Sequence, residues 1–365
     1  MILGQITSCS TANKYLAEDR IMWHKIITRS GNWKISYIPN ARCQTDPPTS
    51  IDTLLKQKRR WHNGSMFVSY SVLRNWWGVI YKEDCCKGFF HNSLFLLLNL
   101  FMLVSNILQY LTISLFFWFY YMVNRSVLGH NQNELSLVVI LERIYLLCLF
   151  ICIILSVSKK AEWTAYGFWI LIIIMGLYSI QIFIFLLIGE NDYWYYTKLL
   201  ATILLLFHKL LPILYSLPCI IVWDILQGSF CYLFLSLTYY NIIPIYSIAN
   251  IHNVTWDSEN ETASKASFSQ STSLKKRTEI NYRNYRSNFM VIWLVINFIT
   301  AYILINAFEN YELAILGAMV FLLMINYSSM LFYTIYLVMY YLKKEDCSTG
   351  NFFKEVRISF PLINI

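Results

Sequence analysis

The chain has 365 residues, of which 57% are hydrophobic and 14% are charged, and its formal net charge is +8. Its mean hydropathy is +0.47. So apolar a composition excludes an ordinary soluble globular protein. It also argues against nucleic-acid binding, which requires a basic face on a soluble fold. The charged residues are concentrated in residues 1–88 and in loops. This distribution predicts a polar module followed by a membrane module.

The polar module is expected to mix helices with a strand. Residues 15–30 have apolar side chains at helical spacing, and residues 32–38 alternate polar and apolar as a half-buried strand does. Asp46-Pro47-Pro48 interrupts the chain, because the residue before a proline avoids the helical region. Ser50 is a good amino-terminal cap for a helix over residues 51–64.

Residues 65–91 combine aromatic and basic side chains. That composition is typical of an amphipathic segment in the lipid headgroup layer. The alternative is a surface helix that packs on the polar module.

Beyond residue 91 the sequence contains hydrophobic segments that are each long enough to cross a bilayer. These segments are 94–121, 135–157, 167–188, 199–222, 225–248, 289–308 and 313–342. We therefore expect an all-α membrane domain of about six or seven segments. It is divided into a first cluster (92–248), a polar loop (249–288), two final spans (289–342) and a cytosolic tail (343–365).

Charge bias places the basic pair Lys159-Lys160 on the cytosolic side, together with residues 1–88. Five full crossings would then put the basic loop 249–288 outside, which conflicts with its charge. One of the five segments is therefore expected not to cross, and segment 199–222 is our candidate, because ionisable residues and prolines interrupt it. A kinked but ordinary span is an equally open interpretation.

Two short motifs in the polar module carry candidate chemistry. Glu18-Asp19-Arg20 places two acids and a cation at a helix start, where a solvated cap is the simpler interpretation. Gln57, Arg60 and Trp61 are spaced i, i+3 and i+4, so they share one face of a helix. Together they offer an amide, a guanidinium and an indole ring, which suit sugar hydroxyls, phosphate and a sugar C–H face.

In combination, these motifs resemble the chitin synthases among the processive family-2 glycosyltransferases. The resemblance lies in three stretches that are similar to characteristic motifs of that family: Ala17-Glu18-Asp19-Arg20, Thr45-Asp46-x-Pro48 and the run from Gln57 to Ser65. Residues 250–256 resemble a further family stretch, which ends at Trp256. Residues 257–259, Asp-Ser-Glu, then replace the family's Gly-Thr-Lys/Arg, so a phosphate or polymer contact there is in doubt.

The resemblance implies a mixed fold. Residues 1–64 would be the carboxy-terminal remnant of an α/β (GT-A-like) glycosyltransferase domain, followed by the membrane domain. The implied reaction is inverting β-1,4 transfer of N-acetylglucosamine from UDP-N-acetylglucosamine to a chitin oligomer. Asp19 would be the general base.

The substrate-binding residues implied by the resemblance are Glu18, Arg20, Gln57, Arg60, Trp61 and Trp256. Glu18 and Arg20 would position Asp19, Arg20 by an ion pair. Gln57 and Trp61 would hold the acceptor sugar, and Arg60 would face the leaving diphosphate. A multi-pass protein of the plasma membrane is implied, in contact with membrane lipids and compatible with a homodimer.

The family holds Mg²⁺ or Mn²⁺ on an Asp-x-Asp motif, and this sequence contains no such motif. We therefore expect no metal ligands in this chain, and we expect the chain alone to make no chitin, as a fragment of a longer enzyme would.

The main rival interpretation is a catalytically inactive membrane subunit or remnant associated with a polysaccharide synthase. A cellulose or hyaluronan synthase and a transporter rank lower, because they leave Asn63-Gly64-Ser65 or both motifs unexplained.

Overall fold

The computed structural model describes residues 8–28, 48–76, 89–128, 132–158, 161–188, 228, 231, 234–254 and 272–307. Over these ranges the protein is predominantly helical and contains no strand. The expected strand over residues 32–38 lies outside them, so the α/β remnant stays a prediction. The helical membrane part of the expected fold is confirmed.

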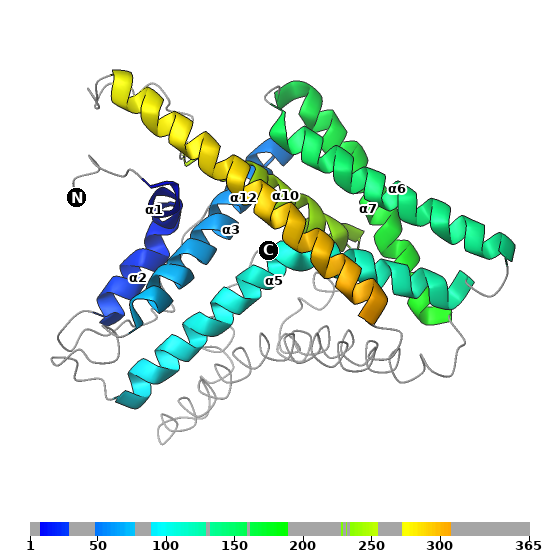
Figure 1. The fold of residues 1–365 in the computed structure, drawn as a ribbon, viewed down its shortest axis with the longest axis horizontal. Coiled ribbons are helices and arrows are strands. Elements are labelled where there is room, and N and C mark those ends of the chain that lie inside the picture. Colours follow the sequence, from blue (N-terminus) through cyan, green and yellow to red (C-terminus); the bar gives the residue numbers. More distant parts are fainter. Residues whose placement is uncertain are drawn as a thin grey trace, which may run out of the picture.

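The helices follow one another as shown in Figure 1. The first elements are α1 (Cys9–Lys14), the 3-10 turn η2 (Tyr15–Ala17), α2 (Glu18–Thr28) and α3 (Ile51–Arg74). The long helices are α5 (Phe89–Leu128), α6 (Gln132–Val157), α7 (Ala161–Ile188) and α12 (Thr272–Ala307). Between α7 and α12 lie the π-helix η3 (Thr238–Ile242) and the short α10 (Ile243–Ala249).

Helix α3 begins where the sequence predicts and ends later than predicted. The Ser50 hydroxyl accepts a hydrogen bond from the Thr53 amide at 3.2 Å, and the Thr53 hydroxyl accepts one from the Ser50 amide at 3.3 Å. This reciprocal capping satisfies two backbone N–H groups that a helix start leaves open. Phe67 and Val68 are buried, so the packed side of the helix continues past Gly64 to Arg74. The expected boundary between residues 64 and 65 therefore falls inside one helix.

Gly64 allows α3 to approach η2 closely. A Cβ at this position would lie 2.8 Å from the Ala17 Cβ and 3.2 Å from the Ala17 backbone nitrogen. Val68, one turn later, packs with Ala17 and Ile21 in a small apolar cluster. The two motif segments are therefore in direct contact, although about forty residues separate them in the sequence.

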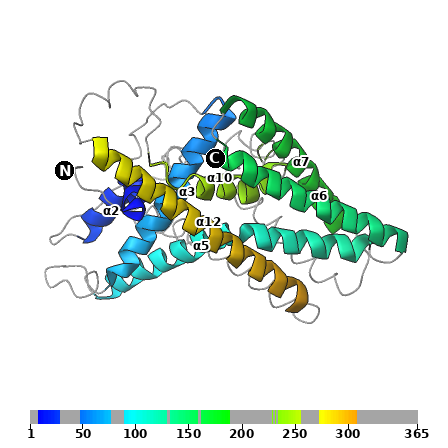
Figure 2. The same ribbon diagram turned by 45° about the horizontal axis from the view of Figure 1, so that its top comes forward.

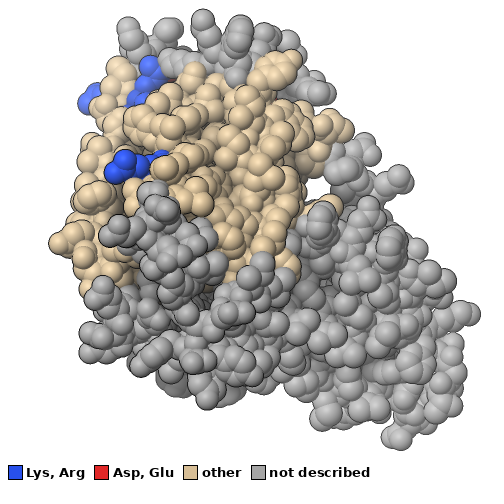
Figure 3. Space-filling view, turned by 90° about the vertical axis from the view of Figure 1, so that its right-hand side faces the viewer, with Lys and Arg blue, Asp and Glu red and all other residues tan. Residues whose placement is uncertain are grey.

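Within the described ranges, three helices are long and apolar enough to cross a membrane: Leu137–Val157, Thr164–Phe185 and Arg277–Asn306. They correspond to three of the expected segments. The candidate segments 199–222 and 313–342 lie outside the described residues, so the count of six or seven remains a prediction. The outer sides of α6 and α7 expose large apolar side chains, among them Ile140, Phe150, Trp169 and Ile173. Figure 3 shows this end of the molecule, where the described surface carries cations only at one edge.

The centre of the helical domain is built from tyrosines. Tyr120 of α5, Tyr145 of α6 and Tyr178 of α7 have ring centroids 4.9 to 5.4 Å apart. The Tyr145 hydroxyl accepts a hydrogen bond from Asn241 of η3 at 2.7 Å. Edge and face contacts of this kind favour one arrangement of the rings. They therefore hold α5, α6, α7 and η3 together, while α12 crosses over α5 in Figures 1 and 2.

The turn after α10 lies beside the end of α6. The Asn250 side chain donates to the Ser156 carbonyl at 3.0 Å. The Ile251 carbonyl accepts from Asn13 of α1 at 2.8 Å. The start of the polar loop 249–288, the end of α6 and helix α1 are thus on the same side of the helical domain. Lys159-Lys160 and residues 255–271 lie outside the described residues, so the membrane sides inferred from charge stay a prediction.

We expect Gly64→Ala to lower the free energy of unfolding by about 1–3 kcal/mol, because the new methyl group must push α3 away from η2. The gain in helix propensity, up to about 1 kcal/mol, acts in the opposite direction. Thermal unfolding of the full chain in detergent measures the change. Gly228→Ala is the matched control, since a Cβ there meets nothing within 4 Å. Equal stability of the two variants would contradict the close contact.

Candidate active site

Glu18 and Asp19 form the first turn of α2, and both are exposed. A general base must be reachable by its substrate. The exposed position of Asp19 meets this requirement, and it is equally compatible with the simpler role of a solvated helical turn.

Arg20 is bound to α3 rather than to its acidic neighbour. Its guanidinium donates a hydrogen bond to the hydroxyl of Ser65. The same hydroxyl accepts from Asn106 of α5 at 3.3 Å. No ion pair joins Arg20 to Asp19 among the described side chains, so the expected pairing is wrong. Arg20 instead fixes the first turn of α2 against α3 and α5.

Gln57, Arg60 and Trp61 lie on the stretch of α3 that precedes the contact with Ala17. Since Gly64 and Val68 continue the same i, i+4, i+7 row, this face is directed to the side on which η2 and α2 pack. Gln57 and Arg60 are half-buried, and Trp61 is 53% exposed. The structure therefore places this face on the same side of α3 as the acidic turn.

Lys58 covers part of the Trp61 ring. Its ammonium nitrogen lies 4.6 Å from the ring centroid, and burial lowers the pKa of this lysine. A cation over an indole face is attracted by the ring quadrupole. A sugar that stacks on that face would have to displace Lys58, whereas the ring's remaining surface is open.

Arg59, rather than Arg60, is the buried arginine of the motif. It is 1% exposed, and its guanidinium donates to the Asn253 carbonyl at 2.7 Å. Sequence reasoning missed this role. A signal was present, because Arg59 stands four residues after Leu55 and eight after Ile51, on the stripe that is buried.

Each residue of the run Asn63-Gly64-Ser65 contacts at least one other helical element. The Asn63 amide donates to the Ser247 carbonyl of α10 at 2.9 Å, and its oxygen accepts from the Tyr110 hydroxyl of α5 at 3.0 Å. Gly64 contacts η2, and Ser65 binds Arg20 and Asn106. These residues therefore fix α3 in position and do not themselves face a ligand.

The beginning of the third motif contacts α1 and the second motif. Asn13 of α1 holds the Ile251 carbonyl, and Arg59 of α3 holds the Asn253 carbonyl. Trp256 and the altered residues 257–259 lie outside the described residues. All three motifs thus converge on α3 from different parts of the chain.

The environment of His252 is strongly positive. Burial is the main reason that its pKa falls to about 4, and Arg286, Arg283 and Arg59 lower it further. Glu279 acts in the opposite direction but forms a 2.5 Å ion pair with Arg283. His62 also has its pKa lowered to about 4, in this case by burial against α5.

The described residues do not fit a divalent metal ion. Among them no group of three His, Cys, Asp or Glu side chains lies close enough together to hold one. Glu18 and Asp19 are neighbours on a single exposed turn, whereas Mg²⁺ takes carboxylates within an octahedral oxygen shell. We derive no catalytic step through a metal.

Comparison with known proteins shows similarity to the chitin synthases. A chitin synthase-like glycosyltransferase domain matches residues 4–76, which include α1, η2, α2 and α3. Chitin synthase A of Ampelomyces quisqualis is 26% identical over 274 residues, or 69% of this chain and 29% of that protein. Chitin synthase 2 of Candida albicans is 26% identical over 294 residues, or 73% of this chain and 28% of that protein.

The chain is similar to the chitin synthases over about 70% of its length. The resemblance inferred from the motifs is thereby confirmed. The similarity extends beyond the glycosyltransferase match into the membrane helices, since an alignment of 276 residues with chitin synthase 1 of Saccharomyces cerevisiae, 27% identical, covers 69% of this chain. The chain spans less than a third of the length of these relatives.

We expect Asn63→Leu to lower the free energy of unfolding by at least about 1–3 kcal/mol, because it leaves the buried Ser247 carbonyl and Tyr110 hydroxyl without their partner. Chemical unfolding in detergent measures the loss. Asn75→Leu, at the exposed end of α3, is the control and should change stability by about 0.5 kcal/mol or less. Similar losses for both variants would show that Asn63 does not hold α3.

His62 predicts a pH dependence of stability. Its folded-state pKa of about 4 is below the ordinary 6.5, so the unfolded chain binds a proton that the folded chain does not. Stability is therefore full above about pH 6.5 and falls as the pH drops toward 4, by up to about 3 kcal/mol for this residue. Unfolding midpoints between pH 8 and 4 should fall less steeply for His62→Phe. An unchanged slope would contradict the assignment.

Proposed function

We propose that this chain carries the acceptor side of a chitin synthase reaction. In that reaction N-acetylglucosamine is transferred from UDP-N-acetylglucosamine to a growing chitin chain with inversion, forming a β-1,4 bond. The observation that supports this most is the direct contact between the acidic turn and the Gln-x-x-Arg-Trp helix, through Ala17 and Gly64. It brings a carboxylate and a sugar-binding face to one side of α3, next to candidate membrane spans.

Asp19 is proposed as the general base. The 4-hydroxyl oxygen of the terminal acceptor sugar attacks C1 of the donor sugar, and the bond from C1 to the diphosphate oxygen breaks. UDP leaves, and the hydroxyl proton passes to the Asp19 carboxylate. A positioned base of this kind typically contributes about 10²–10⁴-fold to the rate.

The neighbouring residues would position the reactants. Gln57 and the open surface of Trp61 would hold the acceptor sugar, with Trp256 as a further polymer contact, and Arg60 would face the diphosphate. Glu18 lies beside Asp19 in the same turn. Arg20 would act indirectly, because its bond to Ser65 fixes the orientation of that turn.

Charge on the leaving diphosphate requires compensation during phosphate-ester departure. The resemblance implies a metal site for this role, and the Asp-x-Asp motif expected for such a site does not occur in this sequence. The proposal is therefore confined to the acceptor half of the reaction, in a plasma-membrane protein with residues 1–88 in the cytosol and the polymer passing between the membrane helices.

The second candidate function is a non-catalytic membrane subunit of a polysaccharide synthase. The position of Lys58 over Trp61 favours it, because the ring face that a sugar would use is partly occupied. The altered residues 257–259 favour it as well.

The test is a chimera in which this chain replaces the matching 28% of Candida albicans chitin synthase 2. Incorporation of radiolabelled N-acetylglucosamine into chitinase-sensitive polymer is measured in membranes. Asp19→Asn should lower incorporation by about 10²–10⁴-fold, whereas Asp19→Glu should retain part of it. Glu279→Gln, which removes an exposed acid on α12, should leave it unchanged.

Full activity of the Asp19→Asn chimera would contradict the proposed base. A chimera that reaches the membrane but makes no polymer would favour the non-catalytic subunit. The unmodified 365-residue chain is expected to make no polymer by itself, and polymer synthesis by it would contradict the restriction to the acceptor half.

A further inference from the structure

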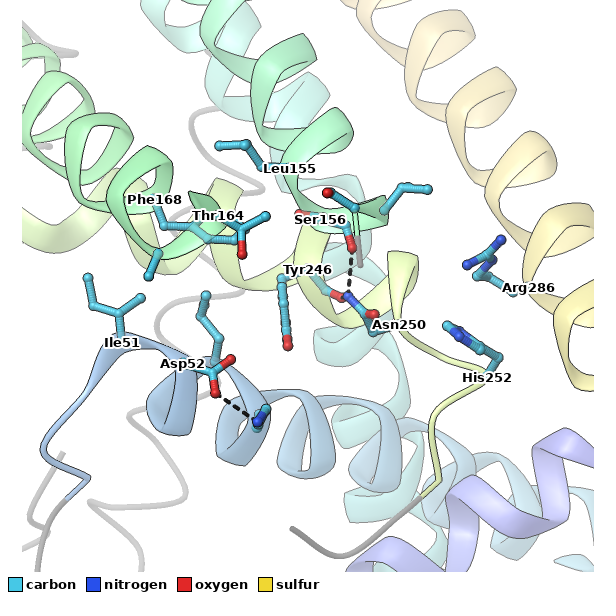
Figure 4. Close-up of a pocket in the computed structure, with 15 residues that line it drawn as sticks. Ile51, Asp52, Leu155, Ser156, Thr164, Phe168, Tyr246, Asn250, His252 and Arg286 are labelled. Carbon is cyan, nitrogen blue, oxygen red and sulfur yellow. Dashed lines mark hydrogen bonds and ion pairs between the residues drawn. The ribbon is translucent and has the colours of Figure 1, made fainter. Parts of the chain in front are cut away.

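A cavity of about 460 Å³ lies where five elements meet. It is bounded by the start of α3, the end of α6, the start of α7, the turn after α10 and the middle of α12 (Figure 4). None of Glu18, Asp19, Gln57, Arg60 or Trp61 lines it. The cavity is therefore a different site from the candidate active site.

The two walls of the cavity differ in chemistry. Figure 4 shows Ile51, Thr164 and Phe168 on one side and His252 and Arg286 on the other. Leu155 adds to the apolar side. A space that is apolar on one side and cationic on the other fits an amphiphile with a negatively charged end.

The cationic side of the cavity contains two buried nitrogen atoms that can take part in hydrogen bonds. The Nε atom of Arg286 is buried and has no hydrogen-bond partner among the described residues. The same is true of Nδ1 of His252. Buried polar atoms are normally paired, so both are available to a ligand inside the cavity.

The charges around the cavity are positive in sum. Lys56 and Asp52 also line it, but they form an ion pair of 2.7 Å with each other. Arg286 is a second lining cation, and the Arg59 and Arg283 charges also reach His252. Guanidinium groups suit phosphate oxygens in particular, because their planar fork donates two hydrogen bonds to one anion.

The position of the cavity matches the depth of lipid headgroups. Leu155, Val157 and Thr164 line it, and they belong to the adjoining ends of two candidate membrane spans. The basic pair Lys159-Lys160 follows at once in the sequence. Basic residues at the ends of spans are typical of the cytoplasmic face, where acidic phospholipids gather.

We propose that this cavity binds a phosphate ester anion, with Arg286 and His252 as donors, and that the headgroup phosphate of an acidic membrane phospholipid is the form its walls fit best. The phosphate would lie against Arg286 and His252, and the acyl chains would pass along Leu155 and Phe168. Since the bound phosphate would connect α12 with the turn after α10, it would stabilise the turn that Arg59 of the motif helix also holds. The proposal does not depend on sugar transfer.

The experiment measures thermal unfolding of the full chain in detergent during titration with three probes. These are dioctanoyl phosphatidic acid, dioctanoyl phosphatidylcholine and inorganic phosphate. We expect phosphatidic acid to raise the unfolding temperature most. Arg286→Gln should weaken its apparent affinity about tenfold or more, since a hydrogen bond to a charged group is lost.

Two further variants distinguish the effect of removing a cation from the effect of filling the cavity. Arg277→Gln removes an exposed cation from the start of the same helix, away from the cavity lining, and should leave the titration unchanged. Ala165→Phe fills the cavity without removing a charge and should abolish the shift. It also decides the question if Arg286→Gln fails to fold.

The outcomes distinguish the sources of the phosphate. If inorganic phosphate shifts the unfolding temperature as phosphatidic acid does, and the same variants remove the shift, the site is upheld and its ligand is a soluble phosphate. If phosphatidylcholine stabilises the chain as well as phosphatidic acid, the site does not select an anion and the proposal fails. It also fails if Ala165→Phe and Arg286→Gln respond to phosphatidic acid as the unmodified chain does.

Discussion

The organisation of this protein depends on α3 being packed on several sides at once. Its Arg59 and Asn63 side chains are buried and satisfy backbone carbonyls of the turn after α10 and of α10 itself. On another side, Gly64 allows contact with η2, and Ser65 accepts from both α2 and α5. A buried polar group without a partner costs about 1–3 kcal/mol, so these bonds leave α3 little freedom to rotate. The orientation of Gln57, Arg60 and Trp61 follows from that constraint.

The same contacts connect the polar module with the membrane helices. Asn13, Arg59 and Asn250 each bind a backbone carbonyl on the side of the domain where α6 ends. A shift of α3 would therefore displace the turn after α10, and a shift of that turn would displace α3. Coupling through a packed polar network of this kind is short-ranged and needs no moving domain.

Several residues of the motifs serve the fold rather than the chemistry. Asn63-Gly64-Ser65 belongs to the motif that resembles the family sequence, yet each of these residues packs against or hydrogen-bonds another helix. Arg59 is similar, since its neighbour Arg60 was the expected functional arginine and Arg59 is the one that is fully buried. A sequence motif of this type thus contains residues proposed to contact a substrate together with residues that fix the helix carrying them. Only the burial pattern separates the two groups.

The sequence by itself determined the helical character of the membrane segments, the start of α3 at Ser50 and the resemblance to the chitin synthases. These depend on local properties: hydrophobic runs of membrane length, a capping side chain, and residue types at fixed spacing. It also indicated that the basic loop 249–288 lies on the side of the amino-terminal module, because charge alone orients spans. The extent of α3 beyond residue 64, the partner of Arg20 and the burial of Arg59 were decided only by the tertiary structure. Each of them depends on contacts between segments that are far apart in the chain, such as Arg20 with Ser65 and Arg59 with Asn253. The cavity beside Arg286 belongs to the same class, since five elements that are distant in sequence have to pack together before it exists.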